Sequence, residues 1–542
     1  MIGAGSYDYI IVGAGSAGCV LAHRLTEDEG ATVLLLEAGG SDRHPYIQIP
    51  LGLGKLQQRK MFDWGYTTEP EPHLNNRRLT LLRGKVLGGS GSINVMAYTH
   101  GHRADFDRWA RDDATGWSFA DVLPYFKKGE SWEKGGSTWR GGSGPLGTEG
   151  TRDLDPLFDA WREAAMLAQW PMSDDPNGSE PIGFSASEWT IKDGRRASGA
   201  TAYLKPVLGR SGLTLRTHAY ATKVTINGSR ATGVEFVTRG EALHAEASRE
   251  VILCGGVFNS PQLLMLSGIG PANHLRQHSI TPLVDLAVGQ NLQDHLQVRI
   301  RWARVSPSPF QRLMRADRAA TAMVRAWLFG TGPATMLPNG LKAFLKTKPE
   351  LDAPDLEFLF LAASLAAGIW FPGVTPPFQD MITANPVLLH PRSCGEVTLR
   401  SADPTQLVRV ANNFLSDPAD IATLREGYRI AQDLAYRRPM EAFRGERLSP
   451  STELTTDSEI DEWIRQEVIT VNHPLGTCSM GRSTDSVLDP DLKVRGVEGL
   501  RVVDAAALPD MPSGHINAIV MMLAERASDL IRGRQLLAQS NA

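Results

Sequence analysis

Short apolar runs that end at glycine or at an acidic residue recur along this chain and predict strands. The first lies within residues 8–12 and leads directly into Gly13, and the second lies within residues 32–36 and ends on Glu37. Residues 251–254 enter two glycines in the same way. A short apolar run bounded by turn residues is typical of a strand in a parallel sheet that is covered on both faces. The pattern therefore predicts an α/β fold.

Other patterns extend this sheet and return to it late in the chain. Residues 223–226 and 233–237 alternate apolar and polar side chains, and an Asn-Gly pair at 227–228 separates them, which predicts a hairpin. Residues 500–503 form another short apolar strand, and residues 518–531 have the apolar spacing of a helix. The sheet that begins near the N-terminus is therefore expected to be completed by residues near the C-terminus.

The middle of the chain has a different character. Residues 300–400 mix aromatic and apolar residues with proline and glycine, which predicts a second, sheet-based domain that lines a pocket. Most of its aromatic residues are expected to be core residues. A chain of 542 residues is also too long for one simple core. We predict a discontinuous nucleotide-binding domain of residues 1–155, 195–300 and 480–542, and a substrate-binding domain of residues 156–194 and 301–479.

The turn after the first strand carries the dinucleotide fingerprint GxGxxG. Gly13 permits the tight turn, Gly15 lets the backbone approach a pyrophosphate, and Gly18 lets the following helix pack closely on the strand. The helix N-terminus directs unpaired N–H groups at the phosphates. Glu37 ends the second strand, where a carboxylate can hold ribose hydroxyls. The fingerprint alone does not separate NAD from FAD.

A second glycine-rich stretch makes the assignment more specific. Residues 83–94 contain four glycines and two serines, which lets the backbone wrap tightly around a flat or phosphorylated group. Residues 84–107 and 256–270 resemble the two signatures of the glucose–methanol–choline (GMC) family of flavoenzymes, with Val257 at a position where a smaller residue is usual. Residues 288–295, 473–481 and 500–531 resemble further segments of the same family. The resemblance covers nearly the whole chain.

This resemblance implies FAD as the cofactor and a GMC oxidoreductase fold, in which a Rossmann-type FAD-binding domain meets a sheet-containing substrate-binding domain. It places the first glycines at the diphosphate, Glu37 at the adenosine ribose, and the helix that begins near Asn517 at the pyrimidine end of the flavin. Val224 resembles a backbone contact to adenine. The implied cofactor-binding residues are Gly13, Gly15, Ser16, Ala17, Gly18, Glu37, Ala38, Trp64, Arg83, Val86, Gly88, Gly89, Asn94, Val95, Met96, Ala97, Val224, Asp504, Ala505 and Asn517.

One departure from some relatives concerns how FAD is held. Certain members of the family bind FAD covalently through a histidine directly before the Asn of the first signature. Ile93 occupies that position here, and an aliphatic side chain cannot form the link. We therefore expect non-covalent FAD.

Two histidines match the active-site positions of the family. His473 precedes Pro-Leu-Gly-Thr, and His515 follows Pro-Ser-Gly at the start of the last predicted helix. Alcohol oxidation needs a base for the hydroxyl proton, and imidazole titrates near ambient pH. We assign His473 as the base and His515 as the partner that holds the alcohol oxygen, and the two roles could be exchanged.

Composition excludes several other classes. A net charge of −4 without a long basic block argues against nucleic-acid binding, and no apolar run reaches the roughly 18 residues that span a bilayer. The early position of the first strand leaves no room for a secretory signal. The four scattered cysteines form no disulfide framework, so the cytoplasm is the expected location. His100 and His102 have no acidic or cysteine company, so no metal site is expected.

The sequence thus predicts FAD-dependent oxidation of a primary alcohol to the aldehyde, with a quinone-like molecule or dioxygen as the electron acceptor. A hydroxynitrile lyase of the same fold, which keeps FAD without using it for redox chemistry, is one alternative. A non-catalytic flavoprotein is the other, and retention of both histidines argues against it.

Overall fold

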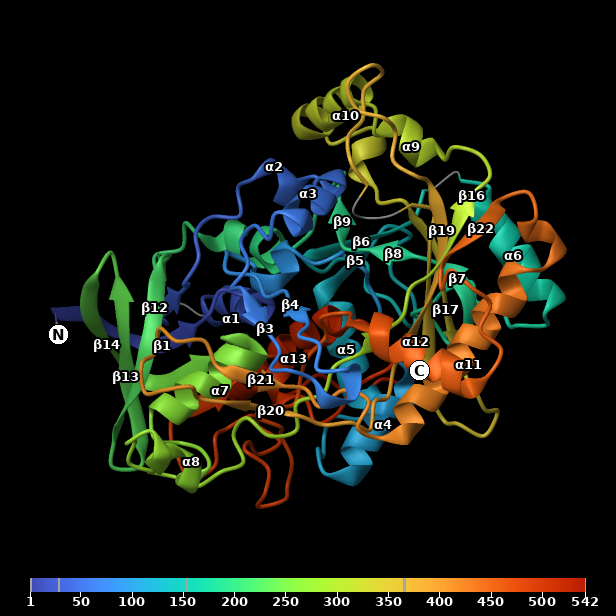
Figure 1. Cartoon of the computed structure of the whole chain (residues 1–542). Coiled ribbons are helices and arrows are strands. Elements are labelled where there is room, and N and C mark those ends of the chain that lie inside the picture. Colours follow the sequence, from blue (N-terminus) through green and yellow to red (C-terminus); the bar gives the residue numbers. More distant parts are fainter. Residues whose placement is uncertain (1, 28–29, 153–154, 364–366, 542) are drawn as a thin grey trace.

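The strands predicted at residues 8–12, 32–36 and 251–254 lie side by side in one sheet of the computed structural model, which describes residues 2–27, 30–152, 155–363 and 367–541 (Figure 1). β1 (Ile2–Val12) is its centre, and it pairs in parallel with β2 (Val33–Leu36) and β14 (Glu241–Leu253). Both β1 and β14 are longer than predicted, because their polar N-terminal halves also pair, with Ile2 opposite Leu243.

The late segments complete this first sheet, as the sequence indicates. β24 (Leu500–Val502) pairs in parallel with β14. The predicted hairpin is formed by β12 (Ala219–Asn227) and β13 (Arg230–Thr238), and β13 pairs with the first half of β14. The observed order is β11-β2-β1-β14-β13-β12, with β24 beside β14.

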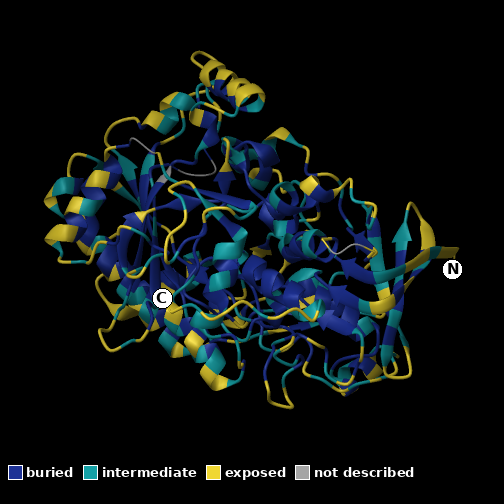
Figure 2. Ribbon diagram, turned by 180° about the vertical axis from the view of Figure 1, so that it is seen from behind, coloured by how far each residue is buried: buried dark blue, intermediate teal, exposed yellow. Residues whose placement is uncertain are grey.

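Helices from the two ends of the chain cover the first sheet together. α1 (Ser16–Leu25) packs on α13 (Ile516–Ile531), and α13 packs on α5 (Phe119–Gly129). Arg24 of α1 and Glu525 of α13 form an ion pair with an N–O distance of 2.8 Å. α13 is buried over almost its whole length, which Figure 2 shows as a dark blue centre.

A second sheet forms the other half of the molecule. Its order among the described residues is β22-β16-β19-β18-β17-β7, and β15 pairs with both β19 and β23. The helices α6 (Leu157–Leu167) and α11 (Pro418–Ala435) pack on one face and bury a separate hydrophobic core around Trp161 and Trp302. Its strands are β7 (Gly183–Ala186), β15 (Leu296–Gln297), β16 (Ile300–Arg304), β17 (Asn339–Leu345), β18 (Leu356–Leu361), β19 (Met381–Leu388), β22 (Arg444–Ser449) and β23 (Ile469–Thr470).

The two cores cross the predicted division of the chain in several places, two of which show the reason. β15 precedes residue 301 but pairs with β19 of the second sheet. Val397 and Val410 lie within the range 301–479, yet they are buried in the core of the first sheet. In both places pairing and packing partners that are distant in the chain decide where the segment lies.

The remaining elements connect or edge these two sheets, and α10 projects at one end of the molecule (Figure 1). They are α2 (Pro45–Gln48), α3 (Leu53–Gln58), α4 (Arg103–Asp112), α7 (Gly256–Leu266), α8 (Ala272–Gln277), α9 (Pro309–Leu313), α10 (Ala316–Phe329), α12 (Asp457–Glu467), β3 (Tyr66–Thr67), β4 (Thr80–Leu81), β5 (Glu130–Trp132), β6 (Leu146–Gly150), β8 (Glu188–Trp189), β9 (Ile191–Lys192), β10 (Arg195–Arg196), β11 (Leu213–Arg216), β20 (Glu396–Thr398) and β21 (Arg409–Ala411).

Candidate active site

A cavity of about 790 Å³ is lined by residues of both sheets. One end is formed by the turn after β1 and the start of α1, and the other end by the exposed face of the second sheet. Most of the residues expected from the sequence lie in its wall. They are Gly13, Gly15, Ser16, Ala17, Glu37, Ala38, Trp64, Arg83, Gly89, Asn94, Val95, Ala97, His473, Asp504, Ala505, His515 and Asn517.

The glycines of the first turn have the geometry that a pyrophosphate needs. Gly13 has a φ of +104°, and a Cβ there would lie 2.4 Å from the carbonyl oxygen of Cys254. A Cβ on Gly18 would lie 1.9 Å from the carbonyl oxygen of Gly13, so helix and turn are in close contact. A Cβ on Gly15 has only one neighbour, at 3.9 Å. Gly15 therefore leaves room at the start of α1, whose first N–H groups have no side-chain cap.

Glu37 connects the two loops at the nucleotide end. Its carboxylate accepts hydrogen bonds from the backbone N–H groups of Ala14 (3.0 Å) and Gly39 (2.7 Å). Burial raises the pKa of Glu37 to about 7, although these two hydrogen bonds act in the opposite direction. The carboxyl group lies in the cavity wall, where it can meet a ribose hydroxyl.

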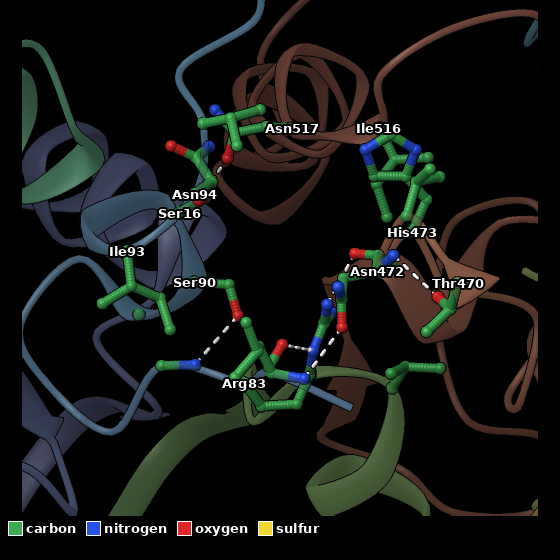
Figure 3. A pocket seen from close by; sticks show the side chains of 18 of the residues that line it. Ser16, Arg83, Ser90, Ile93, Asn94, Thr470, Asn472, His473, Ile516 and Asn517 are labelled. Atoms are coloured by element: carbon green, nitrogen blue, oxygen red, sulfur yellow. Dashed lines mark hydrogen bonds between the residues drawn. The ribbon is translucent and has the colours of Figure 1, made fainter. Parts of the chain in front are cut away.

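The second glycine-rich loop lies directly on the first. The N–H of Gly88 donates to the carbonyl of Ala14 at 2.7 Å, and a Cβ on Gly89 would lie 2.8 Å from the Cα of Gly15. Figure 3 shows Ser16, Asn94 and Asn517 together on one side of the cavity and His473 on the other side. The Ser16 hydroxyl lies 2.7 Å from the Asn517 side-chain oxygen, which joins the starts of α1 and α13.

His473 and His515 belong to a continuous chain of polar side chains. His473 Nε2 lies 3.4 Å from His515 Nδ1, and His515 Nε2 lies 3.0 Å from a carboxylate oxygen of Glu357 on β18. On the other side, His473 Nδ1 lies 3.0 Å from Nδ1 of His295. The two predicted histidines are therefore in contact, and each is oriented by a further residue.

Hydrogen-bond partners assign the protons along this chain. His295 Nε2 lies 2.9 and 3.1 Å from the carbonyl oxygens of Leu389 and Pro512, which can only accept, so this nitrogen carries a proton. Burial lowers the pKa of His295 to about 3, so the ring is neutral and its Nδ1 accepts. His473 Nδ1 must then donate. Burial, together with His515, His295 and Arg83, lowers the pKa of His473 far below its usual range, which leaves a lone pair on Nε2.

The segment that carries His473 is fixed through Asp294. The carboxylate accepts from the His473 backbone N–H at 2.8 Å and from the Thr470 hydroxyl. Arg83 donates to the carbonyls of Leu82 and Asn472, as Figure 3 shows in part. Burial raises the pKa of Asp294 to about 7. These contacts hold the imidazole of His473 at the cavity wall.

Five predicted cofactor residues lie outside the cavity wall. Val86 and Met96 are fully buried in small apolar clusters beside it, and Gly18 and Gly88 form the loop contacts described above. The backbone N–H of Val224 donates to the hydroxyl of Ser267 at 2.9 Å, and the nearby cavity wall is formed by residues 219–221. Their predicted contacts with FAD stay predictions.

Sequence reasoning did not identify two residues of the histidine chain. His295 lies within a segment that resembles the family, but nothing local shows that its ring meets His473. Glu357 is the one acidic residue in the apolar strand β18, and this isolated charge is a signal that could have drawn attention. Of the aromatic residues in the second domain, Phe358 and Phe360 are both buried in the core of the second sheet, and Phe360 also borders the cavity.

Three other expectations concern metal ligands, cysteines and membrane-spanning helices. Within the described residues, no cluster of three or more potential metal ligands is found, and His100 stacks on Phe126 in the interior. All four cysteines are free. No helix in the described part of the chain combines the length and the apolar character needed to cross a bilayer.

A glycine-rich nucleotide turn and a histidine pair share one cavity. This arrangement is typical of dinucleotide-dependent oxidoreductases. The sequence matches the two GMC oxidoreductase family models, one over residues 7–297 and the other over residues 391–524. The chain belongs to this family, as its motifs indicate. It is an FAD-dependent oxidoreductase that acts on CH–OH donors.

Relatives with names of this kind match nearly the full length of the chain. The chain is 42% identical to the oxygen-dependent choline dehydrogenase of Sinorhizobium fredii, over 98% of this chain and 97% of that protein. It is 41% identical to the enzyme of the same name from Brucella ovis, with the same coverage. Such similarity extends over both sheets.

Solved structures show the same fold. Pyridoxine 4-oxidase from Mesorbium loti is 30% identical, with a TM-score of 0.87 over 98% of this chain and 100% of that chain. Formate oxidase from Aspergillus oryzae RIB40 is 29% identical, with a TM-score of 0.90 over 98% and 99% of the two chains. The predicted GMC oxidoreductase fold is thereby confirmed.

Proposed function

We propose that this protein oxidises a primary alcohol to the aldehyde with non-covalently bound FAD, and that a quinone-like molecule or dioxygen accepts the electrons. The observation that carries the proposal is the contact between His473 and His515 in the wall of the cavity. The lone pair assigned to His473 Nε2 is at the position where an alcohol proton can be accepted.

The residues at the nucleotide end fit FAD. The open side of Gly15, the uncapped start of α1 and the carboxyl of Glu37 suit a diphosphate and a ribose. The N-terminus of α13 opens on the cavity at Ile516 and Asn517, and its positive dipole end suits an electron-rich ring. When bound, FAD supplies the two-electron chemistry that no protein side chain provides.

The two histidines divide the work on the hydroxyl group. His473 Nε2 takes the O–H proton, since the hydrogen bond to His295 leaves this nitrogen unprotonated. Glu357 accepts from His515 Nε2 and fixes the second ring, which holds the alcohol oxygen. Both side chains are carried on a rigid frame of two sheets, so the alcohol is oriented before the proton moves.

Anaerobic titration of the purified flavoprotein tests the proposal directly. We expect primary alcohols to bleach the visible flavin absorption, with choline in the panel because the relatives are named for it. His473→Asn should keep the bound flavin and slow its reduction by about 10²–10⁴-fold, the usual contribution of a general base. A protein that no alcohol bleaches would favour the lyase alternative, and equal rates for the variant would remove the role of His473. Readmission of air or addition of a quinone then distinguishes the two acceptors.

The mode of FAD attachment has a separate test. Ile93 is buried among Ile47, Leu56 and Val86, and no histidine occupies its position. Acid precipitation should therefore release all yellow colour into the supernatant, and the intact protein should show no added flavin mass. Colour that stays with the precipitated protein would contradict non-covalent binding.

A further inference from the structure

The cavity-facing side of the second sheet is polar, and several of its buried groups lack partners. Gln297, Thr383 and Asn385 are 8%, 4% and 1% exposed, and each lies in the cavity wall. Each has a buried side-chain oxygen without a hydrogen-bond partner among the described residues. Buried polar groups are costly unless they are paired. These groups can therefore form hydrogen bonds with a polar part of a ligand.

An arginine lies among them. The sheet register pairs Gln297 with Val387 and Arg301 with Thr383, so Arg299 projects on the same side as both of its neighbours, near Asn385. Arg299 lines the cavity, and its guanidinium makes no hydrogen bond or ion pair with any residue that the structure describes. Burial and the neighbouring Arg301 lower the pKa of Arg299, although Glu467 acts in the opposite direction, so a further anion beside the guanidinium would be stabilising.

Among the described residues, no carboxylate of the cavity wall forms an ion pair with Arg299, although Glu467 outside the wall attracts its charge. Three carboxylates line the cavity: Glu37 and Asp504 lie at the nucleotide end, and Glu188 is paired with Arg140 at 3.0 Å. Arg301 lies 3.6 Å from Glu467 and is partly neutralised. Lys342 donates to the carbonyl of Tyr98 and adds a further positive charge to the wall.

At the histidine end of the cavity, Glu357 and Arg83 already have hydrogen-bond partners. Glu357 lies on the same strand as the cavity residues Leu359 and Leu361, and its carboxylate accepts a hydrogen bond from His515. Arg83 donates to two backbone carbonyls and faces the His473 segment. Among the arginines that line the described cavity wall, Arg299 is thus the one whose guanidinium has neither a hydrogen bond nor an ion pair with a described residue.

We propose that the alcohol substrate carries a carboxylate, which Arg299 binds together with the side-chain donors of Asn385, Thr383 and Gln297. This inference rests on the proposed function, since it places the hydroxyl group of the same molecule at His473. The guanidinium fork matches a carboxylate, and the amide groups of Asn385 and Gln297 can present N–H groups after rotation. The substrate class is then a hydroxy acid with a primary alcohol at its far end.

A quaternary ammonium group is poorly suited to this position. Such groups are recognised by aromatic faces and carboxylates. Phe360 is the one aromatic residue that the second sheet contributes to the described cavity wall, and it packs on Trp161 of the core. Since a cation would meet the charge of Arg299, we expect this enzyme to differ in specificity from what its relatives' names indicate.

Matched substrates test the inference through kcat/KM. We compare 4-(hydroxymethyl)benzoate with its benzamide, and 4-hydroxybutyrate with its amide, with choline as the cation. At least one carboxylate should be preferred over its amide, and Arg299→Met should lower kcat/KM for that carboxylate by about 10- to 100-fold, the worth of a hydrogen bond to a charged group. The rate for the amide should stay unchanged.

Two control variants separate charge from packing. Arg299→Lys keeps the charge and should retain part of the preference. Arg447→Met removes an arginine of the adjacent strand β22 that is outside the cavity wall, and it should change nothing. If Arg299→Met lowers kcat/KM equally for the carboxylate and the amide, Arg299 acts on the cofactor or the fold, and the inference is overturned. A preference of the native enzyme for choline or for both amides would also overturn it.

Binding without turnover distinguishes this inference from the proposed function. Benzoate and butyrate, which cannot be oxidised, should perturb the flavin absorption of the native holoenzyme and leave that of Arg299→Met unchanged, whereas benzamide should act on neither. Carboxylate binding in an enzyme whose flavin no alcohol reduces would retain the anion site and reject alcohol oxidation. Reduction by alcohols without carboxylate binding would retain alcohol oxidation and reject the anion site.

Discussion

At the scale of single residues, the position of one proton decides what the histidine pair can do. Two backbone carbonyls fix the proton on His295 Nε2, and this sets the tautomer of His473. On the opposite side of the pair, Glu357 accepts a hydrogen bond from His515 Nε2. His473 Nε2, which carries a lone pair, faces His515 Nδ1 across 3.4 Å, so His473 can accept an alcohol proton beside the second ring.

The lowered pKa of His473 makes a prediction about pH. A base is active when unprotonated, so kcat/KM should fall only as pH drops through the lowered pKa, well below the ordinary histidine value of about 6.5. We expect a flat profile between about pH 6 and 8. The measurement is kcat/KM for a neutral alcohol from pH 4 to 8, with flavin content checked at each pH.

Asp294 needs a control in that experiment, because its pKa is raised to about 7 and its carboxylate holds the His473 backbone. Asp294→Asn removes this titration and keeps a group that can accept from the N–H. An inflection near pH 6.5 that survives in Asp294→Asn would contradict the assignment of a depressed pKa to His473.

At the scale of elements, the nucleotide end is made by two loops that pack backbone against backbone. Gly89 approaches Gly15, and Gly88 donates to Ala14, so the loops support each other where a diphosphate is expected. α1 and α13 both begin at this place, joined by Ser16 and Asn517. Their N-terminal N–H groups therefore converge on one region.

Gly15→Ala tests this arrangement, because the added Cβ enters the cavity without a protein clash. We expect FAD affinity to fall by about tenfold or more, as for a lost hydrogen bond to a charged group, while the apo protein keeps its fold. Gly209→Ala is the matched control, since no atom lies within 4 Å of its Cβ. FAD titration by fluorescence quenching, with circular dichroism of both apo variants, gives the answer. Unchanged affinity in Gly15→Ala would show that the phosphate does not approach this residue.

Local patterns were sufficient for most elements of the first sheet. Most of its strands contain short apolar runs, and the hairpin has an Asn-Gly turn, so these elements could be located from neighbouring residues. The edge strand β11 was not located in this way. The polar face of the second sheet could not be located in this way. Arg299 lies between β15 and β16, Asn385 on β19 and Glu357 on β18, and only long-range strand pairing brings these segments together. The catalytic histidines could be proposed because their flanking motifs resemble the family. Their contact with His295 had no local signal, and the only local sign of Glu357 is an acidic residue in an apolar strand.

At the scale of the whole molecule, two separate cores meet along the cavity. Residues of both sheets line it, so a ligand that fills it adds contacts to each core. The FAD site that we propose extends from the glycine turn toward the histidine pair. Its binding should therefore stabilise the molecule as a unit.

Removal of FAD should lower the unfolding temperature, and addition of FAD should restore it in a concentration-dependent manner. A ligand at 100 times its Kd stabilises the native state by about 2.7 kcal/mol. Thermal unfolding of the apo protein at increasing FAD concentration measures this shift, and FMN, which lacks the adenosine half, should give a smaller one. An unfolding temperature that does not respond to FAD would contradict a cofactor shared by the two cores.

The contact of α13 with α1 also has a consequence for biosynthesis. Ser16 and Asn517 are 501 residues apart, as are Arg24 and Glu525. At about 5–20 residues per second, a ribosome needs tens of seconds to reach the second partner after the first has emerged. The second sheet is translated in that interval, while the first lacks β24 and α13. The nascent chain therefore cannot complete its FAD-binding site until translation is nearly over. FAD binding is then a late event in its maturation.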